Sequence, residues 1–252
     1  MKIAVTYDNG NVFEHFGRTD SFKVYEVEDG KVLSGEVISS HGAGHGALAG
    51  VLYGDVSNVA VTSGTISGGD FVGGLIGNAN SGSLVNVSNA ATVTGSNDVG
   101  GIVGNIGGTV NVNNARNTGN VTADMGAGGI AGQIMPVAGE ELTISNAYNS
   151  GAVKAQGSSY EGSDTYYGAA GGIAGTILAN SEGTYTVKLD NVFNEGVVLG
   201  NPVAQYDYSA GYENPAITGY ENQTGGILGA VSADTANVAV NEIGRASCRE
   251  RV

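Results

Sequence analysis

Hydrophobic and polar residues alternate in short segments near the start of the chain. Residues 1–7 carry aliphatic or aromatic side chains at every second position, and residues 21–27 alternate again through Phe22, Val24 and a possible partner Glu26. This period of two predicts β-strands, and the pair Asp29-Gly30 predicts a turn into a hairpin arm over residues 31–39. A glycine-rich loop follows, and residues 47–49 read as the start of a helix. Strand, hairpin, loop and helix predict the beginning of an α/β domain within residues 1–50.

A glycine motif recurs five times in the rest of the chain. Gly-Gly-aliphatic-x-Gly begins at Gly73, Gly100, Gly128, Gly171 and Gly225. The first two intervals are 27 and 28 residues long, and the later ones lengthen to 43 and 54. Repetition in a fixed order indicates a protein built from stacked, similar units.

An asparagine motif of the form Asn-Ala-x-Asn-x-Gly-x-Val falls between the glycine motifs. Its clear copies begin at Asn114, Asn146 and Asn191, and degenerate copies are assigned to Asn58 and Asn89. Strands of three to five residues precede these copies, too short for an ordinary sandwich. Asparagine at a recurring position predicts a ladder of side-chain amides that bond from one unit to the next.

The two motifs together select the architecture. Short strands without helical patterns between them, with one coil per repeat, predict a solenoid whose coils stack at roughly 4.8 Å. Aliphatic side chains then point inward, and the glycine pairs form corners where a Cβ would not fit. The sequence predicts a mainly β protein: a right-handed parallel β-helix of about five coils, preceded by an incomplete α/β segment.

Composition narrows the class of protein further. The chain has 252 residues, of which 44 are glycine, with 24 acidic and 10 basic residues and a net charge of −14. No apolar run is long enough to span a membrane, and the negative charge disfavours nucleic acid. A single Cys excludes a disulfide framework, and a hydrophobic share of 41% excludes a disordered chain.

The charge is distributed in three blocks. Residues 1–50 contain all three histidines, residues 51–241 contain only three basic residues, and residues 242–252 contain three arginines and the only cysteine. These abrupt shifts predict three segments of different origin.

The three histidines are the candidate cofactor ligands. A flexible loop could bring His41 and His45 toward His15, and imidazole is a suitable ligand for iron. The alternative is that His41 and His45 are exposed loop residues and His15 is a packing residue. No cysteine lies nearby to add a thiolate.

The lengthened intervals contain two insertions rich in tyrosine, at residues 156–168 and 198–224. Exposed tyrosine beside carboxylates suits recognition of a glycan or a protein surface, and loop carboxylates could also bind calcium. The alternative is that the rings cover the flank of the solenoid. The candidate ligand-binding residues are Tyr160, Tyr166, Tyr167, Tyr206, Tyr208, Tyr212 and Tyr220.

The repeat block shows no arrangement typical of an enzyme. It contains no histidine to act as a base and no spaced Cys/His set for a metal. The adjacent pair Glu140-Glu141 would face opposite sides of a strand. We therefore expect no catalytic activity and no catalytic residues.

Several N-terminal motifs resemble the dinitrogenase iron-molybdenum cofactor biosynthesis family. They are the opening Met-Lys-Ile-Ala-Val, the segment Glu-His-Phe-Gly-Arg at residues 14–18, Phe-x-Val-Tyr-x-Val from residue 22, and His-x-x-x-His-Gly-Ala-Leu at residues 41–48. The resemblance implies a ribonuclease H-like α/β fold and an accessory role for iron-sulfur or iron-molybdenum clusters, with the histidines as cluster contacts. The family domain is about twice as long, so the resemblance implies a truncated copy that fades near residues 48–53.

Two other segments carry resemblances of their own. Residues 53–241 resemble the GLUG-motif repeats of bacterial surface and secreted proteins, which implies an extracellular structural or adhesion module with a glycan or a host or cell-surface protein as partner. Residues 242–252 resemble a translated sequencing adapter, which implies that the natural product continues differently after Asn241.

The sequence thus supports one main function and two alternatives. The main one is a non-catalytic surface or secreted β-helix module, structural or adhesive. One alternative is a cluster-binding accessory protein acting through residues 1–50, and the other is a chimeric gene that joins two fragments near Gly50. As written, the N-terminus is no signal peptide and predicts a cytoplasmic protein, whereas the β-helix predicts the cell surface.

Overall fold

The computed structural model is mainly β and contains no helix among the residues it describes. These are residues 2–8, 11–12, 21–28, 31–39, 44–157, 168–179, 182–201, 203–207, 216–221, 223–233 and 237–243. The strands form one antiparallel sheet at the N-terminus, three parallel sheets and one two-stranded hairpin. None of the sheets formed by these described strands closes into a barrel.

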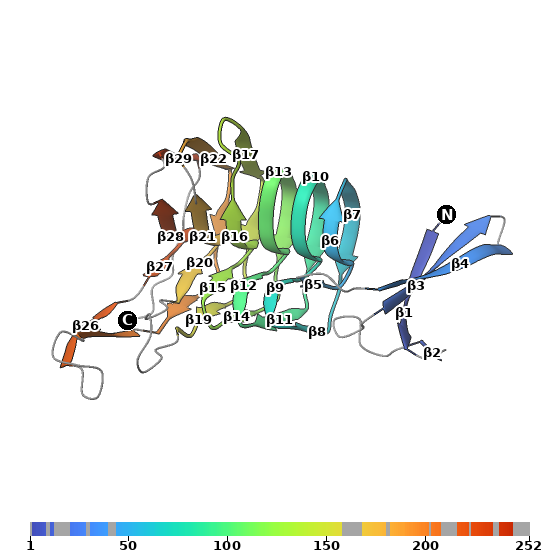
Figure 1. The fold of residues 1–252 in the computed structure, drawn as a ribbon, viewed down its shortest axis with the longest axis horizontal. Helices are drawn as coiled ribbons and strands as arrows, with labels where there is room; N and C mark the ends of the chain where they lie inside the picture. The colour runs from blue at the N-terminus through green and yellow to red at the C-terminus, as the bar shows by residue number, and fades with distance from the viewer. Residues whose placement is uncertain are drawn as a thin grey trace.

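The N-terminal sheet is antiparallel, in the order β2-β1-β3-β4. Its strands are β1 (Lys2–Asp8), β2 (Asn11–Val12), β3 (Ser21–Glu28) and β4 (Lys31–Ser39). The predicted strands and the hairpin between β3 and β4 are confirmed. Figure 1 shows this sheet beyond one end of the three parallel sheets.

The helix expected at residues 47–49 is wrong. The chain instead forms β5 (His45–Gly46), which pairs in parallel with β9 (Asp70–Gly73), and β6 (Ala49–Tyr53), which pairs in parallel with β10 (Ile76–Asn89). Local sequence could not show that a parallel partner lies 27 residues ahead, and that partner satisfies the backbone groups a helix would have satisfied. The described N-terminal part is therefore a β structure, not the start of an α/β domain.

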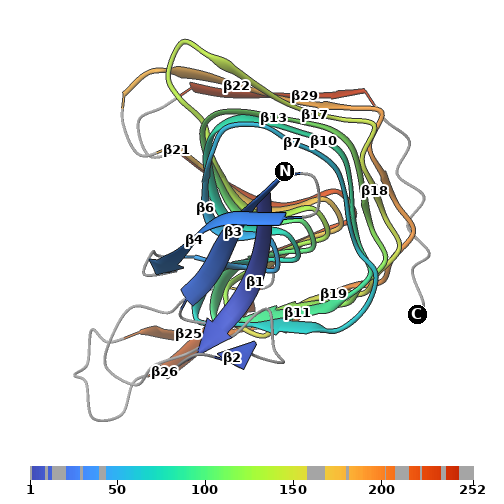
Figure 2. The same cartoon turned by 90° about the vertical axis from the view of Figure 1, so that its right-hand side faces the viewer.

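The three parallel sheets hold the other described strands apart from the two-stranded hairpin, and Figure 2 shows them surrounding a common interior. The wide sheet has twelve strands: β6, β7 (Val56–Val61), β10 (Ile76–Asn89), β13 (Val103–Asn117), β16 (Ala131–Met135), β17 (Glu141–Ser145), β18 (Tyr148–Asn149), β21 (Ala174–Ala179), β22 (Thr184–Asp190), β23 (Phe193–Asn194), β28 (Leu228–Ala233) and β29 (Asn237–Ile243). The five-stranded sheet contains β8 (Thr65–Ser67), β11 (Thr92–Gly95), β14 (Val121–Ala123), β19 (Val153–Ala155) and β24 (Val198–Gly200). The six-stranded sheet contains β5, β9 (Asp70–Gly73), β12 (Asn97–Gly100), β15 (Gly126–Gly128), β20 (Ala169–Gly171) and β27 (Gln223–Gly225).

The chain visits these sheets in a constant order: the wide sheet, the five-stranded sheet, then the six-stranded sheet. We call one such passage a circuit. Each circuit pairs in parallel with the next, as in the register of β10 with β13 and of β13 with β16. Strands β10 and β13 run for 14 and 15 residues, longer than the segments predicted there. Their pairing shifts register between Ala79 and Ser81, which marks a β-bulge or a similar irregularity.

The core is divided into two clusters. One contains the buried residues after each glycine pair and along the wide sheet, such as Ile102, Ile106 and Val112. The other contains the inward residues of the five- and six-stranded sheets, such as Val93 and Val99. Along the chain, side chains switch between the clusters at the glycine pairs and at the buried asparagines. The two sequence motifs therefore mark the boundaries of the core.

Buried asparagines form the inner ladder, which consists of Asn89, Asn117, Asn149 and Asn194. Nδ2 of each of the first three donates to the Oδ1 of the next member, over 2.9, 2.8 and 2.8 Å in turn. Each Nδ2 also donates to the carbonyl oxygen two residues further on, as Asn117 does to Gly119 at 2.8 Å. The four side chains are at most 1% exposed, so their polar groups are satisfied without water. The ladder predicted from the asparagine motif is confirmed.

A second row, the outer ladder, consists of Asn58, Asn86, Asn114, Asn146 and Asn191. All five have positive φ, between 52° and 58°, a left-handed conformation that asparagine tolerates better than most residues. Three adjacent pairs bond, at 3.0 Å (Asn86 to Asn58), 2.7 Å (Asn114 to Asn86) and 2.7 Å (Asn191 to Asn146), whereas Nδ2 of Asn146 donates to Oδ1 of Asn113 at 3.2 Å. The degenerate copy assigned to Asn89 therefore begins three residues earlier, at Asn86. The dipeptide Asn89-Ala90 has the same sequence as the Asn-Ala that opens the clear copies, which explains the shifted assignment.

The glycine motif is explained by close packing, not by left-handed turns. A Cβ on its second glycine would overlap the inner ladder: on Gly74 it would lie 2.6 Å from Cγ of Asn89. The equivalent Gly101, Gly129 and Gly172 meet Asn117, Asn149 and Asn194 in the same way. A Cβ on the first or third glycine would overlap backbone atoms. The second glycine of the glycine motif and the buried asparagine of the asparagine motif therefore pack against each other in the interior.

Candidate functional site

One corner of the fold carries both long insertions. In earlier circuits the five-stranded sheet connects to the six-stranded sheet through one residue (β11 to β12) or two residues (β14 to β15). The same connection holds residues 156–168 between β19 and β20, and residues 201–222 between β24 and β27. We call this place the insertion corner. Because β19 pairs with β24 and β20 with β27, the two insertions leave neighbouring circuits side by side.

Both insertions close on themselves. A Cβ on Gly168 would lie 2.7 Å from the Gly157 nitrogen, so the backbones at the two ends of the first insertion are in contact. The second insertion contains an antiparallel hairpin of β25 (Val203–Asp207) and β26 (Ala216–Glu221). Figure 2 shows this hairpin projecting from the three parallel sheets. Each insertion can therefore vary without altering the circuit that bears it.

The candidate tyrosines are only partly described. Tyr206 lies on β25 and Tyr220 on β26, opposite Ile217 and Ala204 respectively. Tyr160, Tyr166, Tyr167, Tyr208 and Tyr212 lie outside the described residues. The structure therefore places two of the seven residues on one hairpin, and it places the attachment points of both insertions at one corner.

Of the three candidate histidines, the structure describes His45 alone. His45 is exposed on β5, beside Gly68: a Cβ on Gly68 would lie 3.0 Å from Cβ of His45. His15 and His41 lie outside the described residues. Across the residues that are described, no three His, Cys, Asp or Glu side chains gather closely enough to hold a metal ion.

Asp98 is a buried carboxylate that sequence reasoning missed. It is 9% exposed and has a φ of 54°, and the preceding circuit has Phe71 at the equivalent position with a φ of 50°. Nε2 of Gln133 donates to Asp98 Oδ1 at 3.2 Å. Burial, and secondly the charge of Asp70, raise the pKa of Asp98 to about 6. Nothing in the sequence distinguished it from exposed turn residues.

Asp98→Asn should stabilise the protein at pH 8 and weaken the pH dependence of its stability. The pKa of this group rises on folding from 3.8 to about 6, so the folded state holds a proton that the unfolded state has lost between these values. Its contribution to stability is full below pH 4 and is lost as the pH rises through 6, by about 3 kcal/mol at most. Guanidinium unfolding at pH 4 and pH 8 checks this. Identical pH dependence in the variant and the parent would contradict the prediction.

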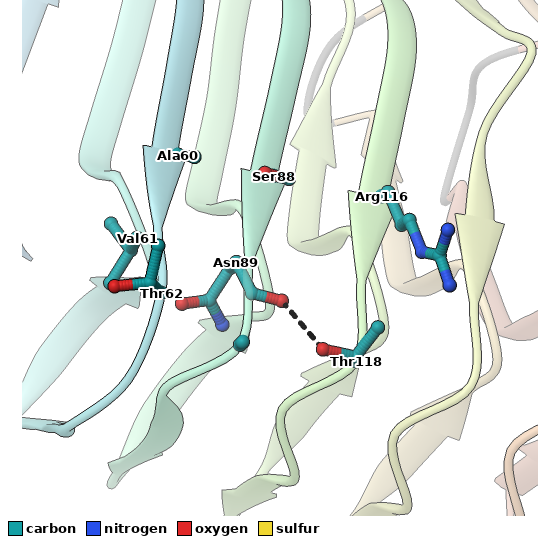
Figure 3. A pocket seen from close by; sticks show the side chains of 8 residues that line it. Ala60, Val61, Thr62, Ser88, Asn89, Arg116 and Thr118 are labelled. Atoms are coloured by element: carbon teal, nitrogen blue, oxygen red, sulfur yellow. Dashed lines mark hydrogen bonds between the residues drawn. The ribbon is translucent and has the colours of Figure 1, made fainter.

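A shallow pocket lies at the end of the wide sheet nearest the five-stranded sheet. Its volume is about 250 Å³, and it is lined by Ala60, Val61, Thr62, Ser88, Asn89, Ala90, Arg116 and Thr118. Figure 3 shows these residues on three successive circuits, with the Thr118 hydroxyl donating to the Asn89 carbonyl oxygen at 3.3 Å. Val61 stands at the position that the inner ladder fills with asparagine in later circuits.

Comparison with known proteins places a family on the N-terminal part of the chain. Residues 1–67 match the family described as dinitrogenase iron-molybdenum cofactor. That match includes the N-terminal sheet and continues through β5 to β8, which pair in the three parallel sheets. It therefore extends past the boundary at residue 50 that the charge distribution suggested.

A curated relative supports the same segment. An uncharacterised protein of Methanocaldococcus jannaschii is 38% identical over 50 residues, which is 18% of this chain and 42% of that protein. The chain thus spans less than half the length of this relative. No solved structure gives a significant match. No helix in the described part of the chain is long and apolar enough to cross a membrane.

Proposed function

We propose that the three parallel sheets are a right-handed parallel β-helix of about five coils. In this proposal residues 53–241 are a GLUG-type, non-catalytic module of a bacterial surface or secreted protein, preceded by a partial domain over residues 1–50. In the same proposal residues 242–252 are an artefactual adapter-derived tail, whose first two residues continue β29. Support comes from the constant order of sheets and from the parallel register of successive circuits. The recurring asparagines and glycines bond to the next circuit or pack against it. A binding function would therefore belong to the segments that do not recur.

The observation that carries a binding role is the insertion corner. Two tyrosine-rich insertions leave neighbouring circuits at the same corner, so tyrosines distant in sequence come from adjacent attachment points. Aromatic rings that combine an apolar face with a hydroxyl suit recognition of glycans or protein surfaces. The module is thus adhesive as well as structural, with a glycan or a host or cell-surface protein as its partner.

Removing the first insertion tests this function. The full chain should bind a component of a glycan or extracellular-matrix array, and deletion of residues 158–167 should abolish that binding. The deletion should leave thermal unfolding unchanged, because the backbones of Gly157 and Gly168 are already in contact. A matched control replaces the same ten residues with Gly and Ser, which keeps the loop length and removes the aromatic rings. Binding that survives in both variants would sink the proposal.

The family match favours a second candidate, a cluster-binding accessory function in the cytoplasm. Residues 1–67 match a family whose description concerns the iron-molybdenum cofactor. In this reading His15, His41 and His45 contact an iron-sulfur or iron-molybdenum cluster. Anaerobic reconstitution of the full chain should then give a visible absorption band that is lost in the triple His→Ala variant. An unchanged spectrum after reconstitution counts against this candidate.

The adhesion module predicts the cell surface, whereas the cluster-binding protein predicts the cytoplasm. A chimeric gene that joins two fragments near Gly50 would explain why one chain carries both signals. Amplification of source DNA across codons 48–53 separates the cases. A continuous product supports a real fusion, whereas flanks that amplify only separately support a chimera.

A further inference from the structure

A row of amide side chains on the wide sheet is interrupted beside Asp98. Asn78, Asn105 and Gln133 occupy equivalent positions on β10, β13 and β16. Nδ2 of Asn105 donates back to Oδ1 of Asn78 at 3.1 Å. The next bond of the row is missing, because Nε2 of Gln133 donates to Oδ1 of Asp98 at 3.2 Å instead. Asp98 therefore takes the donor that would continue the row.

The interruption leaves a buried acceptor without a donor. Oδ1 of Asn105 has no hydrogen-bond partner, and the residue is only 4% exposed. Nδ2 of the same amide lies toward Asn78, and 3.8 Å from the place that a Cβ on Gly107 would take. The oxygen and the nitrogen of an amide diverge from Cγ, so Oδ1 points away from Asn78 and toward Gln133. An unpaired buried acceptor is costly and marks the place of a missing donor or cation.

Asp98 brings a negative charge to the same place. A Cβ on Gly132 would overlap the Asp98 carbonyl carbon, so the Asp98 backbone lies directly against the residue that precedes Gln133. The side chain of Asp98 is 9% exposed, and no Lys, Arg or His of the described ranges forms an ion pair with it. Buried carboxylates in proteins are usually paired with a cation. The carboxylate and the unpaired amide oxygen thus lack the same kind of partner.

The arrangement carries one buried charge and does not recur. Phe71, Gly126 and Ala169 stand at the positions equivalent to Asp98 on neighbouring circuits, and none of them can be charged. Asp70, the nearby carboxylate, is exposed and already accepts from Nδ2 of Asn97 at 2.6 Å. One carboxylate beside neutral oxygen atoms matches a single positive charge. Carboxylate and carbonyl oxygens are the ligands that hard cations, including alkali-metal ions, prefer.

We propose that the carboxylate of Asp98 and Oδ1 of Asn105 bind an alkali-metal cation, Na⁺ or K⁺, where the six-stranded sheet meets the wide sheet. The cation neutralises the buried carboxylate and gives the amide oxygen its missing partner. It also links β12 to β13, strands that belong to successive circuits. The site is separate from the insertion corner, and it stands whether or not the tyrosines bind a partner.

Thermal unfolding of the full chain in three chloride salts tests the site. Sodium, potassium and tetramethylammonium chloride are compared at equal ionic strength, with EDTA present, so that screening is the same and divalent ions are removed. Tetramethylammonium has the same charge but is too large to enter. The midpoint should be at least roughly 3 °C higher in sodium or potassium chloride than in the tetramethylammonium salt. Equal midpoints in the three salts would overturn the proposal. A midpoint that responds to pH but not to the cation would overturn it too, because a proton would then fill the place.

Three variants of the full chain locate the cation. Asp98→Asn removes the charge and keeps a residue that tolerates a φ of 54°, so the difference between the salts should vanish. The gain in stability expected above for this variant is measured in the tetramethylammonium salt. Asn105→Leu removes the amide oxygen and should also abolish the difference.

Asp124→Asn is the matched control for net charge. Oδ1 of Asp124 accepts from Nε2 of Gln156 at 3.3 Å, as Asp98 does from Gln133, but Asp124 is not buried. The difference between the salts should persist in this variant. A difference that survives in Asp98→Asn, or that is lost equally in Asp124→Asn, would overturn the proposal.

Discussion

Gly101→Ala is expected to lower the free energy of unfolding by about 3 kcal/mol or more. A Cβ at this position would overlap the carbonyl oxygen of Gly129 and the amide of Asn117, and neither group can retreat without breaking contacts with the next circuit. Overpacking of a closed interior is relieved only by moving the backbone, which is why we expect the upper end of the usual range. The guanidinium unfolding midpoint measures the loss.

Gly69→Ala is the matched control for this substitution. A Cβ on Gly69 would meet no atom within 4 Å, and its φ is not positive. This variant should change stability by less than about 1 kcal/mol, and restriction of the unfolded chain could raise it slightly. Equal unfolding midpoints for the two variants would show that the glycine motif is not explained by interior packing.

Asn117→Asp is expected to destabilise the protein by about 3–5 kcal/mol at neutral pH, because it buries an uncompensated charge. The asparagine donates to Gly119 O and to Asn149 Oδ1, both at 2.8 Å, and its side chain is 0% exposed. An aspartate would direct an acceptor at these two acceptors. The loss should shrink at acid pH, where a protonated carboxyl regains one donor. Chemical unfolding at pH 4 and pH 7 measures both effects.

Asn114→Asp makes the same chemical change on the outer ladder. Asn114 is exposed, has a φ of 54° and donates to Asn86 Oδ1 at 2.7 Å. Aspartate also tolerates this backbone, and water can solvate its charge, so we expect a loss of about 1 kcal/mol or less. A comparable loss for both variants would mean that burial of the inner ladder does not set its contribution.

Prediction succeeded where a residue's role is repeated along the chain. The positions of the glycine and asparagine motifs were visible in the sequence, and so was the ladder that joins successive asparagines. The antiparallel strands at the N-terminus followed from alternation and from turn residues. In each case the residue types and their spacing can be read from the sequence without knowing which strands pair.

Prediction failed where a partner far along the chain decides the outcome. Residues 47–49 look helical alone, but the pairing of β6 with β10 makes them part of a sheet. The copy assigned to Asn89 was shifted by three residues, because only the bond from Asn86 to Asn58 reveals the alignment. The role of Gly101 was read as a corner, whereas its function is to admit the side chain of Asn117.

The candidate sites divide in the same way. The sequence identified the tyrosine-rich insertions and the histidines as residue types with suitable chemistry. It did not indicate that the two insertions share a corner, that Arg116 lies over Tyr148, or that Asp98 is buried with a raised pKa. These features depend on contacts between circuits, from the 28 residues that separate Asp70 and Asp98 to the 54 that separate Ala169 and Gln223.

The sequence by itself determined the mainly β character, the repeating motifs and the amide ladder, because spacing and side-chain type are local properties of the chain. The tertiary structure decided which face each motif buries, where the insertions meet and which carboxylate is buried. Stacking brings residues of successive circuits to within a strand spacing of one another, and no local pattern encodes that distance.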